Sequence, residues 1–140
     1  MTYPDPLAAA LAGRPDVDQL LRRPGSRIAE IGCRAGASSF ALARAFPQAS
    51  VEGWDTDRRW VDLARTEVER EGLADRVVFS WTDGSYLRDG WYDVIFVNGG
   101  TDEPGLVGRI PRPVLEAARR ALRPGGTMVQ VEAGGESAAG

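Results

Sequence analysis

Short apolar runs alternate along this chain with longer segments whose apolar residues recur every three or four positions. A short run bounded by glycine, proline or polar residues is typical of a buried strand, and the longer spacing is typical of a helix with one buried face. The pattern predicts strands over 27–31, 50–54, 77–79, 94–97 and 128–131. It predicts helices over 38–46, 57–71 and about 113–122, the first capped by Ser38 and the second by Asp57, after two short helical clusters over 7–11 and 17–21.

The predicted strands are apolar throughout rather than alternating, which indicates a parallel sheet covered on both faces. Strands that alternate with helices, joined by right-handed crossovers, give a doubly wound α/β fold. We therefore expect a mainly parallel sheet of about five strands with helices on both faces. At 140 residues, the chain has the size of one domain. We expect that domain over 1–133, with a helical lead-in over 1–26 and a flexible tail over 134–140.

The segment from Glu30 to Gly36 leads from the first predicted strand into a helix and carries glycine at Gly32 and Gly36. Glycine lets the backbone approach a ligand, and the free amides at a helix start favour a carboxylate or phosphate. Ligands of doubly wound sheets bind beyond the carboxyl ends of the strands, where the strand order reverses. The turn lies at that place, although a tight turn without a ligand would give the same pattern.

Acidic residues follow the next two predicted strands. Asp55, followed by Thr56, ends the second strand, where such folds hydrogen-bond the hydroxyls of a ribose. Asp83, followed by Gly84, ends the third strand, where it can accept a hydrogen bond from an adenine amine while backbone amides face the ring. The alternatives are local, since an acid can cap a helix or begin a turn, but Asp57 is better placed than Asp55 to cap.

Together these segments resemble the class I S-adenosylmethionine (SAM)-dependent methyltransferases, whose fold is Rossmann-like, over roughly residues 27–133. The family's first motif is similar to residues 29–36, its second to 53–57, its adenine segment to 72–77 with Asp83, its fourth strand to 92–96 and the turn before its fifth to 122–126. The resemblance implies SAM as cofactor, with Glu30 reaching the methionine amino group. The implied cofactor-binding residues are Glu30, Gly32, Arg34, Gly36, Asp55, Thr56, Asp83, Gly84 and Asn98. A nicotinamide-binding turn would instead be expected as Gly-x-Gly-x-x-Gly, and here the glycines are four apart after an acid.

Arg34 stands where this family usually has its middle glycine. If the turn needs a positive φ at that position, a residue other than glycine costs about 1–2 kcal/mol, and SAM would bind weakly. If the turn avoids that conformation, the guanidinium can reach a carboxylate of the methionine or of the methyl acceptor. The sequence leaves both alternatives open.

Residues 98–105, after the fourth predicted strand, carry no compact signature of enzymes that methylate nitrogen atoms of nucleic acids or proteins. Asn98, Asp102 and Glu103 are candidates to position or deprotonate an acceptor, and the alternative is a solvated loop. We therefore expect a methyltransferase that transfers methyl to oxygen, nitrogen or carbon of a small molecule. The alternative is a methyltransferase-like protein that no longer methylates, such as a SAM-binding accessory subunit or a fold reused for another reaction.

The composition argues against several classes of partner and of catalytic chemistry. The formal net charge is −3 and there is no dense Lys/Arg run, so we expect no nucleic-acid partner. No window is long and apolar enough for a membrane span, so we expect no membrane partner and a cytoplasmic location. Cys33 is the only cysteine and histidine is absent, which argues against Ser-His-Asp or Cys-His catalysis and against a bound metal, and makes Cys33 a packing residue.

Two further expectations concern apolar side chains. The aromatic residues Trp60, Trp81, Tyr86 and Trp91 are expected in the core, with stacking on adenine or lining an acceptor pocket as the alternative. The strand over 128–131 would be a bare sheet edge, because the family's sheet normally continues for two more strands. An exposed apolar edge invites pairing, so we expect a homodimer or a partner chain over it.

Overall fold

The computed structural model describes residue 7 and residues 11–83, 87–98 and 111–131. Three predicted site residues, Gly84, Asp102 and Glu103, lie outside the described residues. So do Tyr86, most of the predicted 7–11 helical cluster and the whole of the predicted tail.

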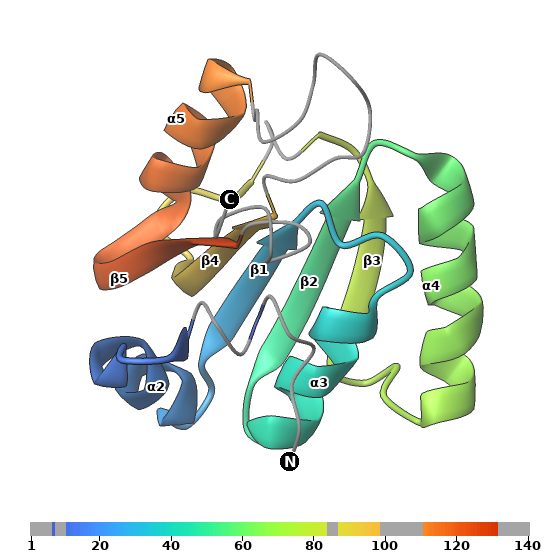
Figure 1. Ribbon diagram of the computed structural model, residues 1–140, viewed down its shortest axis with the longest axis horizontal. Coiled ribbons are helices and arrows are strands. Elements are labelled where there is room, and N and C mark those ends of the chain that lie inside the picture. The colour runs from blue at the N-terminus through green and yellow to red at the C-terminus, as the bar shows by residue number, and fades with distance from the viewer. Residues whose placement is uncertain (1–6, 8–10, 84–86, 99–110, 132–140) are drawn as a thin grey trace.

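Strands and helices alternate along the described chain, as the apolar pattern predicts (Figure 1). Their order is α2 (Pro15–Arg22), β1 (Arg27–Ile31), α3 (Ala37–Ala45), β2 (Ser50–Asp55), α4 (Arg58–Glu71), β3 (Val77–Trp81), β4 (Tyr92–Asn98), α5 (Arg112–Ala121) and β5 (Leu122–Val131). The last three strands are longer than predicted, because pairing with neighbouring strands continues beyond their apolar runs.

All five strands are parallel and lie in the order β3-β2-β1-β4-β5. The order reverses at β1, which pairs with β2 on one side and with β4 on the other. This confirms the doubly wound α/β fold. It also brings the carboxyl ends of β1, β2 and β4 side by side, with β3 next to β2.

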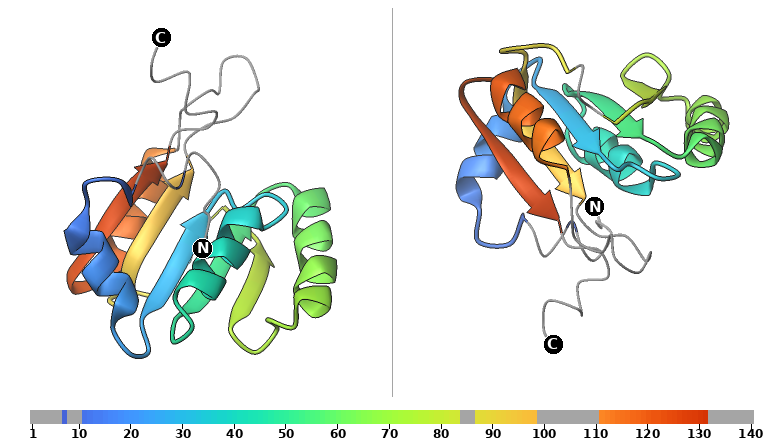
Figure 2. Two further views of the ribbon diagram at one scale, coloured as in Figure 1. Left: turned by 60° about the horizontal axis from the view of Figure 1, so that its bottom comes forward. Right: turned by 90° about the horizontal axis from the view of Figure 1, so that it is seen from above.

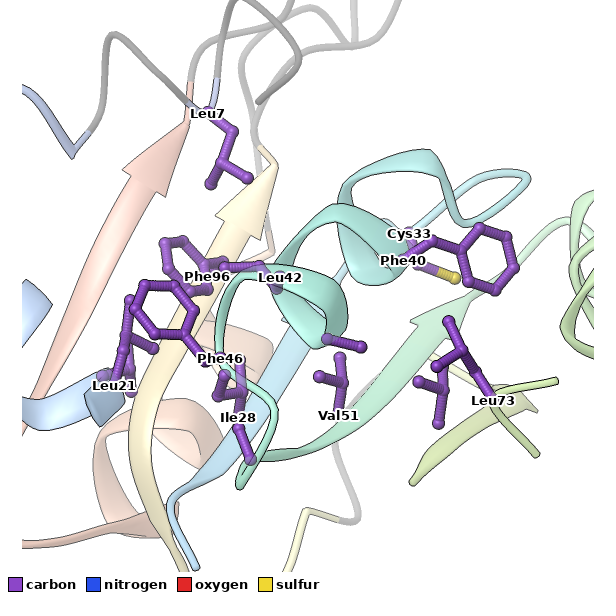
Figure 3. Packing of buried hydrophobic residues seen from close by; sticks show 14 of the residues in the cluster. Leu7, Leu21, Ile28, Cys33, Phe40, Leu42, Phe46, Val51, Leu73 and Phe96 are labelled. Atoms are coloured by element: carbon purple, nitrogen blue, oxygen red, sulfur yellow. The ribbon is translucent and has the colours of Figure 1, made fainter. Parts of the chain in front are cut away.

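Helices cover both faces of the sheet (Figure 2). Helices α2, α3 and α4 pack on one face around a cluster that includes Leu21, Ile28 and Phe96 (Figure 3). Helix α5 packs on the other face, where Val114 and Ala118 belong to one cluster with strand residues such as Ile95. No helix of the described residues is long and apolar enough to cross a membrane.

The ends of α4 follow the sequence signals, whereas the start of α3 does not. The Asp57 side chain accepts a hydrogen bond from the Arg59 amide at 2.9 Å, and Gly72 closes α4 in the left-handed conformation. Helix α3 begins at Ala37 with Gly36 as its N-cap and without a side-chain cap. The prediction of Ser38 as the cap was therefore wrong.

Asp93 joins the amino ends of three strands. Its side chain is 3% exposed and accepts hydrogen bonds from the Arg27 amide at 2.8 Å and from Arg123 Nη1 at 2.7 Å. Beside it, the pairing of β4 with β5 shifts register between Tyr92 and Val94. A Cβ on Gly126 would lie 2.8 Å from the Asp93 carbonyl oxygen, so the bulge depends on glycine there.

Replacing Asp93 with alanine should lower the free energy of unfolding by about 2–3 kcal/mol, because two hydrogen bonds to a buried charge are lost. Urea unfolding measures this change. Asp18→Ala is the matched control, since Asp18 forms only an exposed pair with Arg22 at 2.8 Å, and it should change stability by less than about 0.5 kcal/mol. Similar small changes in both variants would contradict the role given to Asp93.

Candidate functional site

Polar side chains gather where four strands end. Glu30 lies one residue before the end of β1, Asp55 is the last residue of β2 and Asn98 is the last residue of β4. Asp83 follows β3 by two residues and is exposed. The turn over 32–36 connects β1 to α3 in the middle of this group, so the fold brings together the acids that the sequence places far apart.

The turn has three residues in the left-handed region: Gly32 at φ 81°, Arg34 at φ 51° and Gly36 at φ 93°. Among the residues that the structure describes, Arg34 is the only one other than glycine with a positive φ. This φ decides between the two alternatives for Arg34. The turn adopts the left-handed conformation with arginine in it, which costs about 1–2 kcal/mol. The alternative in which the turn avoids a positive φ was wrong.

Other parts of the protein occupy the space that a side chain on the glycines of the turn would need. A Cβ on Gly32 would lie 3.1 Å from the Asn98 carbonyl oxygen, and a Cβ on Gly36 would lie 2.8 Å from Phe79 Cζ. Gly53 in β2 is equally confined, because its Cβ would lie 2.6 Å from Phe79 Cδ1. The turn is therefore seated tightly against β4 on one side and against the β3 aromatic ring on the other.

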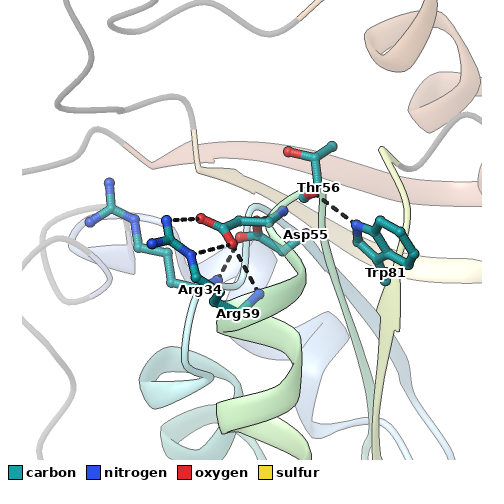
Figure 4. Close-up of polar contacts among 6 residues, drawn as sticks. Arg34, Asp55, Thr56, Arg59 and Trp81 are labelled. Atoms are coloured by element: carbon teal, nitrogen blue, oxygen red, sulfur yellow. Dashed lines mark hydrogen bonds and ion pairs between the residues drawn. The ribbon is translucent and has the colours of Figure 1, made fainter.

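Asp55 fastens the turn to β2 (Figure 4). One carboxylate oxygen accepts a hydrogen bond from the Arg34 amide at 2.9 Å, and the other accepts one from the Asp57 amide at 2.8 Å. The residue is half-buried, and each carboxylate oxygen can accept a second hydrogen bond. Asp55 can thus hold the turn and still accept from the hydroxyls of a ligand.

Trp81 lies beside Thr56 at the ends of β2 and β3. Its indole N–H donates to the Thr56 carbonyl at 2.9 Å (Figure 4). The Arg58 guanidinium lies 5.2 Å from the centre of its ring. Trp81 is 56% exposed and Trp60 is 38% exposed, so the prediction that these two residues belong to the core was wrong. The signal for Trp81 is its place before the polar residues Thr82 and Asp83, at the end of an outer strand of the sheet.

Glu30 is 1% exposed and both of its oxygens are hydrogen-bonded within the protein. Ser39 Oγ donates to one oxygen at 2.5 Å, and Asn98 Nδ2 donates to the other at 2.8 Å. Burial raises the pKa of Glu30, and the hydrogen bonds from Ser39, Asn98 and Ser38 oppose that rise. Ser39 is not among the residues predicted from the sequence. Its signal is a polar residue on a helix whose neighbours Phe40 and Leu42 are buried.

Cys33 lies in the same turn and is buried. Burial, together with the nearby acids Glu30 and Asp55, raises the pKa of the thiol, which disfavours the nucleophilic thiolate. Within the described part of the chain, no three acidic or cysteine side chains gather closely enough to hold a metal ion.

The strand order and the acids at the strand ends define a Rossmann-like α/β protein with a site at its topological switch point. The family described as "Methyltransferase domain" matches residues 28–126, and the chain belongs to this family. Its structural neighbours are SAM-dependent methyltransferases, and SAM is the cofactor of this class.

Three relatives illustrate the likeness. The chain is 33% identical over 134 residues to methyltransferase GfsG of Streptomyces halstedii, covering 89% of this chain and 44% of that protein. It is 41% identical over 56 residues to geranyl diphosphate 2-C-methyltransferase of Saccharopolyspora erythraea, covering 40% and 19%. A SAM-dependent methyltransferase from Geobacter sulfurreducens, solved with S-adenosylhomocysteine, has a TM-score of 0.61 at 25% identity, covering 91% and 55%. The chain thus spans less than half the length of the curated relatives it matches.

Replacing Arg34 with glycine should raise the free energy of unfolding by about 0.5–1 kcal/mol. The relieved strain of about 1–2 kcal/mol exceeds the entropy cost of glycine, about 0.5–1 kcal/mol. Arg34→Ala is the matched control, because alanine keeps the strain while it removes the guanidinium. Urea unfolding compares the two variants. An equal gain in both would show that the guanidinium, and not the backbone conformation, destabilises the wild-type turn.

Proposed function

We propose that this chain forms the cofactor-binding core of a methyltransferase that transfers the methyl group of SAM to oxygen, nitrogen or carbon of a small molecule. The observation that carries the proposal is the arrangement of acids around one left-handed turn, with Asp55 at the end of β2 and Asp83 after β3. Acids at these ends suit the hydroxyls of a ribose and the amine of an adenine.

The residues present fit an adenosyl ligand. Asp55 accepts one backbone hydrogen bond on each oxygen, which leaves acceptor capacity for two ribose hydroxyls. Asp83 is exposed beside that position and can accept from the adenine amine, with Thr56 and Trp81 next to it. When bound, SAM supplies a methyl group that is activated by a sulfonium. The role of this chain is to bind and orient it, which is the main contribution available to such a site.

The structure favours a positioning role for Asn98 over that of a base. Its Nδ2 donates to Glu30 and to the Gly32 carbonyl oxygen, at 2.8 and 2.9 Å. Asp102 and Glu103 stay predictions for a group that positions or deprotonates the acceptor. The small-molecule proposal is supported by the relative named geranyl diphosphate 2-C-methyltransferase, since geranyl diphosphate is a small molecule.

A further proposal concerns the assembly of the domain. Strand β5 is an edge of the described sheet, and a homodimer or a partner chain pairing with it would satisfy its free backbone groups. Light scattering at high concentration tests this proposal, and a monomer would count against it.

We also propose that the protein is cytoplasmic and that residues 1–133 form a single domain.

A second candidate function rests on Arg34. Because arginine occupies a left-handed position that favours glycine, the turn is strained, and a protein that binds SAM weakly and no longer methylates would tolerate this substitution. The two candidates differ in methyl transfer rather than in binding. Transfer of labelled methyl from SAM to a panel of small hydroxyl, amine and carbon acceptors supports the first, and binding without transfer to any of them supports the second.

Calorimetry with SAM, S-adenosylhomocysteine and NAD tests the cofactor and the role of Asp55 together. We expect binding of the first two ligands only, and Asp55→Asn should weaken it by at least about tenfold, since hydrogen bonds to a charged group contribute about 1.5–3 kcal/mol. Asp57→Ser is the matched control in the same loop, because serine keeps the α4 cap, and its affinity should stay within about threefold. Unchanged affinity in Asp55→Asn would rule out the ribose assignment.

A further inference from the structure

Three polar side chains from three different elements meet beneath the turn: Glu30 from β1, Ser39 from α3 and Asn98 from β4. Glu30 accepts from Ser39 Oγ at 2.5 Å and from Asn98 Nδ2 at 2.8 Å. The same Asn98 nitrogen donates to the Gly32 carbonyl oxygen at 2.9 Å. The three side chains and the turn therefore form one connected hydrogen-bond network.

Close packing accompanies the hydrogen bonds. A Cβ on Gly32 would lie 3.1 Å from the Asn98 carbonyl oxygen and 3.3 Å from Asn98 Cβ. Strand β4 therefore lies directly against Gly32, the first left-handed residue of the turn. Glu30 and Ser39 are 1% and 0% exposed. Glu30 thus lies under the turn, on the protein side, rather than on the surface where a ligand would bind.

We propose that Glu30 and Ser39, which are buried, and Asn98, which is half-buried, form a clamp that holds the turn in its left-handed shape, with Glu30 and Asn98 as positioning residues and with Glu30 out of contact with the cofactor. This inference rests on the proposed function of the turn as the cofactor site. It assigns Glu30 a different role from direct contact with the methionine amino group, because Glu30, unlike the half-buried Asp55, is 1% exposed and has both carboxylate oxygens hydrogen-bonded inside the protein.

Hydrogen bonding fixes the orientation of the Asn98 amide. A Glu30 carboxyl oxygen and the Gly32 carbonyl oxygen both accept hydrogen bonds, so the nitrogen of Asn98, and not its oxygen, faces them. The other titratable groups near Glu30 are Asp55 and the Cys33 thiol, and burial raises the pKa of that thiol.

The first test compares Glu30→Gln with Glu30→Ala by calorimetry with S-adenosylhomocysteine. Glutamine can accept from Asn98 with its oxygen and donate to Ser39 with its nitrogen, so the clamp predicts an affinity within about threefold of wild type. Alanine removes the clamp and should weaken binding at least about tenfold. A loss of more than about tenfold in Glu30→Gln would mean that the charge itself contacts the ligand, and would overturn the proposal.

The second test is a pH profile of Asn98→Asp. Two carboxylates at this separation share one proton, and at higher pH both ionise and repel. The affinity of Asn98→Asp relative to wild type should fall by about tenfold from pH 6 to pH 8, which corresponds to one pKa unit. In the double variant Glu30→Gln/Asn98→Asp, the introduced glutamine amide can donate to the introduced carboxylate, so the pH dependence should disappear. A ratio that stays constant with pH would overturn the proposal.

A third measurement needs no ligand and separates the clamp from the proposed function. Hydrogen exchange of the Gly32, Cys33 and Arg34 amides should be at least about tenfold faster in Asn98→Ala than in wild type. Gln130→Ala, which removes an exposed amide side chain from β5, is the matched control and should leave these amides unchanged. If wild type binds neither SAM nor S-adenosylhomocysteine, the proposed function fails, and exchange then decides the clamp: unchanged exchange in Asn98→Ala overturns it.

Discussion

Glu30 places a carboxylate in a position that is 1% exposed, between a turn, a helix and a strand. A charge removed from water is costly unless hydrogen bonds replace the lost solvent, so the surrounding elements must bring donors to it. Ser39 does so from α3 and Asn98 from β4. The start of α3, the end of β4 and the shape of the turn are therefore mutually dependent, and Asp55 adds the end of β2 by binding the Arg34 amide.

The sequence predicts the sheet well because buried parallel strands are continuous apolar runs, and the runs around Ile28, Val51 and Ile95 stand out from their surroundings. It predicts the position of Asp55 for a related reason, since the end of a strand fixes where its next polar residue lies. It does not predict the hydrogen bond from Asn98 to Glu30, which joins residues 68 positions apart. It also misplaces the cap of α3, because Gly36, in the left-handed conformation that the turn imposes, precedes the helix in place of a serine.

Arg34 shows that tertiary contacts can override the conformational preference of a residue. The rule that a left-handed position favours glycine makes arginine an exception, and the structure keeps the left-handed conformation despite the side chain. Neighbouring contacts supply the reason. The Arg34 amide bonds to Asp55, and Gly32 and Gly36, two residues away on either side, are packed closely against Asn98 and Phe79. The conformation belongs to the turn as a whole, and the residue at its centre adapts to it.

The strand order has a consequence for how such a domain can change. The turn follows the central strand β1, whereas β3 and β5 are the outer strands of the described sheet. Strand β5 is separated from the turn by β4, whereas β3 reaches the turn through Phe79, which packs against Gly36. The two margins of the sheet are therefore unequal: additional segments at β5 leave the turn untouched, which lets one cofactor core be combined with many different surroundings, while β3 belongs to the site.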